Sequence, residues 1–187
     1  MATRVAPSLG VFLKSIPVGV YFNICSFGTS HSFPWPRSSY TAQTFAEAQQ
    51  YYNSIQADFG GGTEIPLQIR ATISNRLPSL NLEIMVLTDG EVWNTADFFP
   101  YVESETGKKK GDVRVFTLGI GRDVSHLLID GLARVGKGFS QVVSDEREGM
   151  EGKVVRMLRG ALSRQPIAIV ISLLHETTLR HPGFITP

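Results

Sequence analysis

A run of apolar residues that ends at a carboxylate constrains the fold of this chain most strongly. Residues 84–87 are all apolar, and Thr88, Asp89 and Gly90 follow them directly. Such a run indicates a strand buried on both faces, which is typical of parallel strands in α/β sheets. Because ligand sites in these sheets lie beyond the carboxyl ends of the strands, we expect Asp89 at a functional edge. Taken alone, the same three residues also fit a simple strand-ending turn.

The composition is that of an ordinary globular chain. Of its 187 residues, 42% are hydrophobic and 19% are charged, which is enough to bury a substantial core. A formal net charge of +1 gives no electrostatic reason to expect nucleic acid or a membrane surface as partner. The single cysteine, Cys25, excludes an internal disulfide and fits a reducing compartment. The apolar segments 9–13 and 167–174 are shorter than the ~20 residues of a membrane span, so we expect a cytoplasmic protein.

The spacing of apolar residues predicts alternating helices and strands. Strands are expected at 20–27, 80–88, 113–118, 139–143 and 167–173, and helices at 9–16, 45–59, 65–77, 95–106, 128–135 and 149–163. Thr44 and Glu47 are placed as a capping box for the second helix, and Thr29–Ser39 is expected to be a loop with at most a short edge strand at Ser32–Phe33. This alternation predicts a doubly wound, mostly parallel α/β sheet with helices on both faces.

Two of the predicted loops carry oxygen ligands. Thr63, after Gly61 and Gly62, would stand at a helix amino terminus, and Asp89 would stand at a strand carboxyl end. In a doubly wound sheet these two loops lie on the same edge. A hydroxyl and a carboxylate offer the hard oxygens that suit Mg²⁺ or a similar divalent cation, although two protein ligands are too few on their own.

Four segments in the same order resemble the von Willebrand factor A (VWA) domain of proteins that combine it with a vault-protein/inter-alpha-trypsin (VIT) domain. They are Pro17–Ile24, Gly61–Ile65, Leu87–Val92 and Val115–Gly121, and the resemblance covers about residues 8–163. It implies a Rossmann-like sheet with a metal-ion-dependent adhesion site (MIDAS) at one edge. It also implies a non-enzymatic protein-interaction module, in which an acidic residue of a protein partner completes the metal coordination.

Matched position by position, Thr63 corresponds to the threonine of the MIDAS and Asp89 to its aspartate. The DxSxS motif, which supplies the other ligands from the first strand of the family, occurs nowhere in this chain. That first strand would fall before Met1, so the resemblance implies an incomplete MIDAS for Mg²⁺. We therefore divide the chain into a VWA-like domain, residues 1–163, incomplete at its amino terminus, and a carboxyl-terminal strand and tail, residues 164–187.

The absent first strand is central in the sheet of the family. Without it, the strands at 20–27 and 80–88 would have unpaired inner edges, at a cost of about 1 to 3 kcal/mol for each buried group. The continuous apolar run 167–173 is unsuited to a solvent-facing edge, so we expect it to insert between those two strands. His175, Glu176, Thr177 or Thr178 would then approach Thr63 and Asp89. The alternatives are a tail packed outside the sheet, or an incomplete fragment.

Other readings of the same residues stay open. Gly119 and Gly121 partly match a dinucleotide-binding fingerprint, but Val124 replaces its third glycine, which favours an ordinary strand-to-helix turn. Asp89 and Glu91 could form a general acid/base pair in a Mg²⁺-dependent hydrolase or phosphoryl-transfer domain. A degenerate structural remnant is a third hypothesis.

Overall fold

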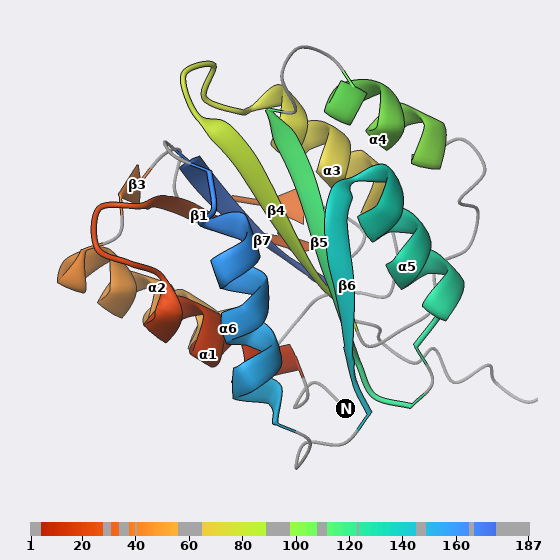
Figure 1. Cartoon of the computed structure of the whole chain (residues 1–187). Helices are drawn as coiled ribbons and strands as arrows, with labels where there is room; N and C mark the ends of the chain where they lie inside the picture. Colours follow the sequence, from red (N-terminus) through yellow and green to blue (C-terminus); the bar gives the residue numbers. More distant parts are fainter. Residues whose placement is uncertain are drawn as a thin grey trace, which may run out of the picture.

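The computed structural model describes residues 5–27, 31–33, 38–39, 41–55, 65–88, 98–107, 112–122, 124–144, 149–164 and 167–174. These form a sheet with helices on both of its faces (Figure 1). The helices are α1 (Val5–Ser15), α2 (Ala42–Ile55), α3 (Ile65–Ser74), α4 (Phe98–Gly107), α5 (His126–Val135) and α6 (Met150–Ala161). The strands are β1 (Tyr21–Phe27), β2 (His31–Ser32), β3 (Ser38–Ser39), β4 (Asn81–Thr88), β5 (Val113–Ile120), β6 (Lys137–Val143) and β7 (Ile167–Leu174).

The described strands form one mostly parallel sheet in the order β2-β1-β7-β4-β5-β6, with β3 also paired to β1. Strands β1, β7, β4, β5 and β6 are parallel to their neighbours, whereas the two-residue strands β2 and β3 run antiparallel to β1. The doubly wound, mostly parallel α/β fold predicted from the sequence is confirmed. The parallel strands β1, β7, β4, β5 and β6 end on the same side of the sheet, and we call this side the carboxyl edge.

Strand β7 occupies the slot between β1 and β4. Residues Ala168–Leu174 pair with Tyr21–Phe27 on one side, and residues Ile167–Leu173 pair with Asn81–Leu87 on the other. The predicted insertion of the last strand is therefore confirmed. Its physical reason is the pairing of backbone groups on both inner edges, together with burial of Ile169 and Ile171, which are both fully inaccessible to solvent.

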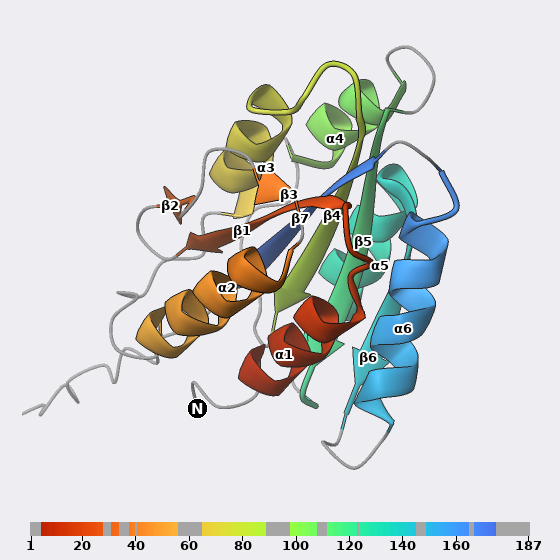
Figure 2. The ribbon, with the colours of Figure 1, turned by 90° about the vertical axis from the view of Figure 1, so that its left-hand side faces the viewer.

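The two faces of the sheet bury separate apolar cores. Helices α1, α2 and α6 cover the face that carries Met85, Leu87, Ile169 and Ile171. Helices α3, α4 and α5 cover the opposite face, as the two views of the ribbon show (Figures 1 and 2). Side chains alternate between the faces along each strand, so neighbouring residues of β7 contribute to different cores.

Several local details differ from the sequence predictions. Helix α2 begins at Ala42, and the reciprocal capping bonds join Thr41 and Thr44, because each side-chain oxygen accepts from the backbone N–H of the other residue at 2.8 and 3.2 Å. Thr44 therefore takes the place predicted for Glu47, whose carboxylate accepts from Gln43 at 3.1 Å. The segment predicted as a loop contributes both β2 and β3, and α3 ends at Ser74, before Leu77. None of the described helices combines the length and the apolar character that crossing a bilayer requires.

Candidate functional site

The carboxyl edge is built from strands that end at matching positions. Phe27 of β1 pairs with Leu174 of β7, and Thr88 of β4 pairs with Gly119 of β5. Thr88 is buried, with 1% of its surface exposed. The strand that precedes Asp89 thus ends at the edge where the architecture places ligand sites, as the sequence predicted.

Helix α3 runs from the carboxyl edge of the sheet toward the opposite edge, which we call the amino edge. Its carboxyl end, Ser74, is followed closely by Asn81, the first residue of β4, so its amino end at Ile65 faces the carboxyl edge. Ile65 is fully buried and anchors that end of the helix. Thr63 precedes this anchor by two residues in the sequence. Thr63 and Asp89 themselves lie outside the described residues, as do Glu91 and residues 175–178.

A buried polar layer lies beneath the carboxyl edge, between α3 and the sheet. Gln68 and Thr72 of α3 and Ser172 of β7 are at most 2% exposed. Among the described residues, the amide nitrogen and oxygen of Gln68 and the hydroxyl of Ser172 have no hydrogen-bond partner. Sequence analysis missed this layer. The signal was present, because Gln68 and Thr72 are four residues apart and run parallel to the apolar stripe of Ile69 and Ile73.

Cys25 belongs to the same layer, and its thiol is unreactive in the folded chain. It pairs with Ser172 across the β1–β7 ladder and is fully buried. Burial raises the pKa of the Cys25 thiol from 9.0 to about 12, and the neighbouring Thr72 hydroxyl lowers it by a smaller amount. The thiol is therefore protonated at neutral pH and has the character of a small hydrophobic side chain.

The glycines after β5 have structural reasons to be glycine. Gly121 has a φ of 114°, a conformation that other residues rarely adopt. A Cβ atom at Gly119 would overlap the side chain of Ile129 in α5. Close packing of this helix on β5 and a sharp turn thus account for both glycines without a nucleotide.

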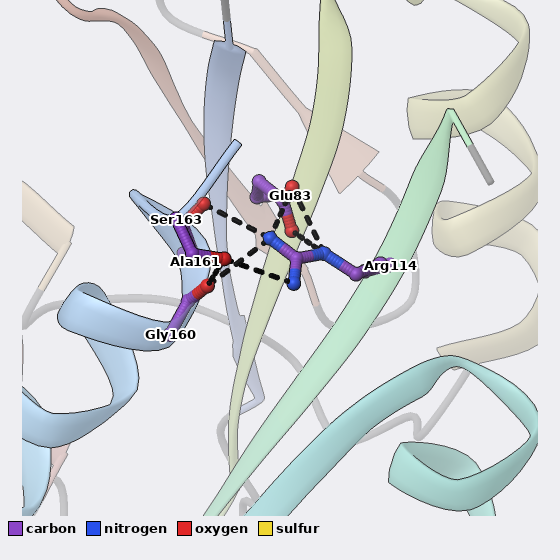
Figure 3. A network of polar contacts seen from close by, with 5 residues as sticks. All are labelled: Glu83, Arg114, Gly160, Ala161 and Ser163. Carbon is purple, nitrogen blue, oxygen red and sulfur yellow. Dashed lines mark hydrogen bonds and ion pairs between the residues drawn. The ribbon is translucent and has the colours of Figure 1, made fainter. Parts of the chain in front are cut away.

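A buried ion pair stabilises the part of the sheet away from the carboxyl edge (Figure 3). Arg114 of β5 donates to Glu83 of β4 through Nε at 2.9 Å and through Nη2 at 2.8 Å. Its Nη2 also donates to the carbonyl oxygens of Gly160 and Ala161, at 3.1 and 3.0 Å, in the last turn of α6. A guanidinium at this end complements the partial negative charge of the helix carboxyl terminus.

The same ion pair lies next to the beginning of β7. Glu83 pairs with Ile169 across the β4–β7 ladder, and its side chain is 1% exposed. Burial raises the pKa of Glu83, while the hydrogen bonds and charge of Arg114 oppose that rise. The network fixes the end of α6, from which the chain leads to β7. Sequence analysis gave no indication of it, because nothing in the local pattern shows that residues 83 and 114 are neighbours.

Within the described part of the chain, no three or more His, Cys, Asp or Glu side chains are grouped so that they could hold a metal ion. The described residues include the elements next to the two predicted ligands in the sequence, since Asp89 follows β4 and Thr63 precedes α3.

A doubly wound, mostly parallel sheet with helices on both faces defines a Rossmann-like domain. A sequence model of the von Willebrand factor type A domain matches residues 2–142. The chain therefore belongs to the von Willebrand factor type A domain family, as the motifs indicated.

Curated relatives agree with this assignment. The chain is 38% identical over 169 residues to human von Willebrand factor A domain-containing protein 5A, covering 89% of this chain and 20% of that protein. It is 32% identical over 164 residues to human von Willebrand factor A domain-containing protein 5B1, covering 86% of this chain and 13% of that protein. The chain thus spans a fifth or less of the length of these two relatives.

Solved structures agree on the fold. An aerotolerance-related membrane protein from Bacteroides fragilis superposes with a TM-score of 0.70 at 13% identity, over 85% of this chain and 87% of that one. The conserved hypothetical protein BatB from Bacteroides thetaiotaomicron gives a TM-score of 0.67 at 15% identity, over 84% and 87% of the two chains. At such identities the likeness concerns the fold alone.

Proposed function

We propose that this chain is a non-enzymatic protein-interaction module of the VWA type, working in the cytoplasm through the carboxyl edge of its sheet. The observation that carries the proposal is the family membership, because VWA domains commonly mediate protein–protein interactions. The common end of β1, β7 and β4 supports it, since loops that follow these strands leave the sheet on one side. The proposed ligand is a protein, and neither nucleic acid nor a membrane surface is required.

The proposed recognition site is an incomplete MIDAS. Thr63 would supply a hydroxyl and Asp89 a carboxylate, a donor set that suits Mg²⁺. The DxSxS ligands are absent, so an acidic residue of the partner would complete the coordination. Residues 175–178 follow β7 directly and include a histidine, a glutamate and two threonines. Because β7 occupies the central slot, these residues are candidates for the missing protein ligands.

Calorimetric titration with Mg²⁺ and Mn²⁺ tests the metal site. The wild-type chain, Asp89→Ala and the control Asp112→Ala would be compared. Asp112 directly precedes β5, at the amino edge of the sheet. Its backbone carbonyl oxygen accepts a hydrogen bond from the Leu82 N–H at 2.6 Å, and the substitution keeps this backbone group. We expect the cation to bind the wild type and the control but not Asp89→Ala.

The other outcomes separate the components of the proposal. Equal binding by all three proteins would remove Asp89 from the site. Absence of binding in the wild type would leave a metal-free interaction module. Turnover of a phosphoester by the wild type, lost in Asp89→Ala, would contradict the non-enzymatic function and favour hydrolysis through Asp89 and Glu91.

A further inference from the structure

The side-chain amide of Gln68 is buried without the partners that such a group normally has. The residue is 1% exposed, and neither the amide oxygen nor the amide nitrogen has a hydrogen-bond partner among the residues that the structure describes. Buried polar groups are normally paired, and an unpaired amide costs the folded chain free energy. Because proteins tolerate such costs mainly at functional sites, the surroundings of this amide indicate where a ligand could bind.

The contacts of α3 with the sheet place Gln68 close to the carboxyl edge. Helix α3 contacts β1 and β7, and the Thr72 side chain is hydrogen-bonded to Cys25, two residues before β1 ends at Phe27. Because α3 starts at the carboxyl edge, Gln68 lies one helical turn, or about 6 Å, nearer that edge than Thr72. Two residues of a strand cover about the same distance. Gln68 is therefore about level with the last residue of β1.

The geometry of α3 also directs this amide toward the carboxyl edge. Side chains of an α-helix point back toward its amino terminus, and the amino end of α3, at Ile65, faces the carboxyl edge. Ile65, Gln68 and Ile69 are all buried, so this side of the first turns of α3 faces the sheet. The Gln68 amide is therefore aimed along the sheet, beneath the loops that follow the strand ends.

We propose that Gln68 is a positioning residue of the cation site at the carboxyl edge. Its amide oxygen accepts a hydrogen bond from a water on the cation, and its amide nitrogen donates to a carboxylate ligand. A bound Mg²⁺ ion keeps several of its waters, and its ligands need hydrogen-bond partners of their own, so such a site offers both groups that this amide lacks. The inference rests on the proposed function and adds a residue that no sequence motif indicated.

The stability of the cation-free chain gives the first test. In EDTA, Gln68→Met should unfold at a higher urea concentration than the wild type, because an apolar side chain of similar length replaces an unpaired buried amide. This gain should shrink when Mg²⁺ is added, since the cation stabilises only the chain that binds it more tightly. A lower urea midpoint for Gln68→Met in EDTA would show that the amide is already paired without a cation, and would overturn the proposal.

Calorimetric titration of the full chain with Mg²⁺ and Mn²⁺ gives the second test. Gln68→Met should bind either cation about tenfold more weakly than the wild type, as expected when a hydrogen-bond partner of a metal site is lost. At pH 8, Gln68→Glu should bind at least as tightly as the wild type, because it keeps an acceptor and adds a negative charge. Ser172→Ala is the matched control. It removes another unpartnered buried group, level with Cys25 and thus deeper in the sheet, and should bind like the wild type.

The outcomes separate this role from the proposed metal site. Cation binding that is lost in Asp89→Ala but unchanged in Gln68→Met would overturn the role of Gln68 and leave the metal site standing. Binding that is weakened in Gln68→Met but unchanged in Asp89→Ala would support Gln68 and remove Asp89. Equal weakening in Gln68→Met and Gln68→Glu would show a merely structural role and contradict the proposal. Absence of binding in the wild type would overturn the metal site and this role together.

Discussion

At the scale of single residues, two buried hydroxyls on the same face of the sheet have opposite environments. Thr117 and Ser172 are both 1% exposed. The Thr117 hydroxyl donates to the carbonyl oxygen of Ile129 at 2.8 Å, whereas the Ser172 hydroxyl has no partner among the residues that the structure describes. Burial alone therefore says little about what a polar side chain contributes to stability.

Removing these two hydroxyls should have different effects. Thr117→Val loses a buried hydrogen bond and should lower the free energy of unfolding by about 1 to 2 kcal/mol. Ser172→Ala removes a group that is already unsatisfied and should change that free energy by less than about 0.5 kcal/mol. Urea denaturation of both variants measures the difference. An equal loss in the two variants would show that Ser172 has a hydrogen-bond partner in solution.

The Cys25 thiol gives a pH-dependent prediction. Its pKa in the folded chain is raised from 9.0 to about 12, so the thiol favours the folded state fully below pH 9.0, and this contribution is lost as the pH rises toward 12. Iodoacetamide at mildly alkaline pH should modify Cys25 only after unfolding. Unfolding curves should show less loss of stability above pH 9.0 for Cys25→Ala than for the wild type. Rapid alkylation of the folded chain would contradict the burial of the thiol.

At the scale of elements, the Glu83–Arg114 pair joins three parts of the chain. It links β4 to β5 and ties both to the end of α6, next to the beginning of β7 (Figure 3). A buried ion pair of this kind contributes little compared with a well-packed apolar pair, but loss of one partner leaves a buried charge behind.

Arg114→Met should therefore be strongly destabilising, by about 3 to 5 kcal/mol at neutral pH. Burial already raises the pKa of Glu83, and loss of Arg114 removes an interaction that lowers it. The protonated form is thus the one compatible with burial, so part of the lost stability should return when the pH falls from about 8 to about 5. Denaturant curves across this range measure the effect. The double variant Glu83→Gln/Arg114→Met should show little of this pH dependence, and its persistence there would exclude Glu83 as the titrating group.

Strand β7 is the element on which the sheet depends most. A chain that ends at Arg164 lacks both ladders that β7 makes with β1 and β4. We expect it to lose the cooperative thermal transition, because two inner edges and two apolar faces become exposed. A chain that ends at Leu174 retains both ladders and provides the control. Melting of the shorter chain at the temperature of the full chain would show that β7 does not stabilise the sheet.

At the scale of the whole molecule, the sequence predicted the architecture better than the site. The parallel sheet and the insertion of residues 167–173 were predictable, because a strand that is apolar on both faces must be buried on both sides. The surroundings of the buried polar residues Gln68, Glu83 and Arg114 were not predictable, because each depends on which distant element faces it. Thr63 and Asp89 lie outside the described residues, and their role as metal ligands stays a prediction.

The central position of β7 also determines when the sheet can be completed during synthesis. Strand β1 leaves the ribosome before its parallel neighbour β7, because the paired residues Tyr21 and Ala168 are far apart in sequence. Until residue 174 has been synthesised, the nascent chain keeps two open strand edges. Such long-range parallel pairing forms slowly and leaves unpaired strands available for aggregation. The sheet can therefore be completed only after β7 has left the ribosome, and until then the open edges of β1 and β4 are available for aggregation.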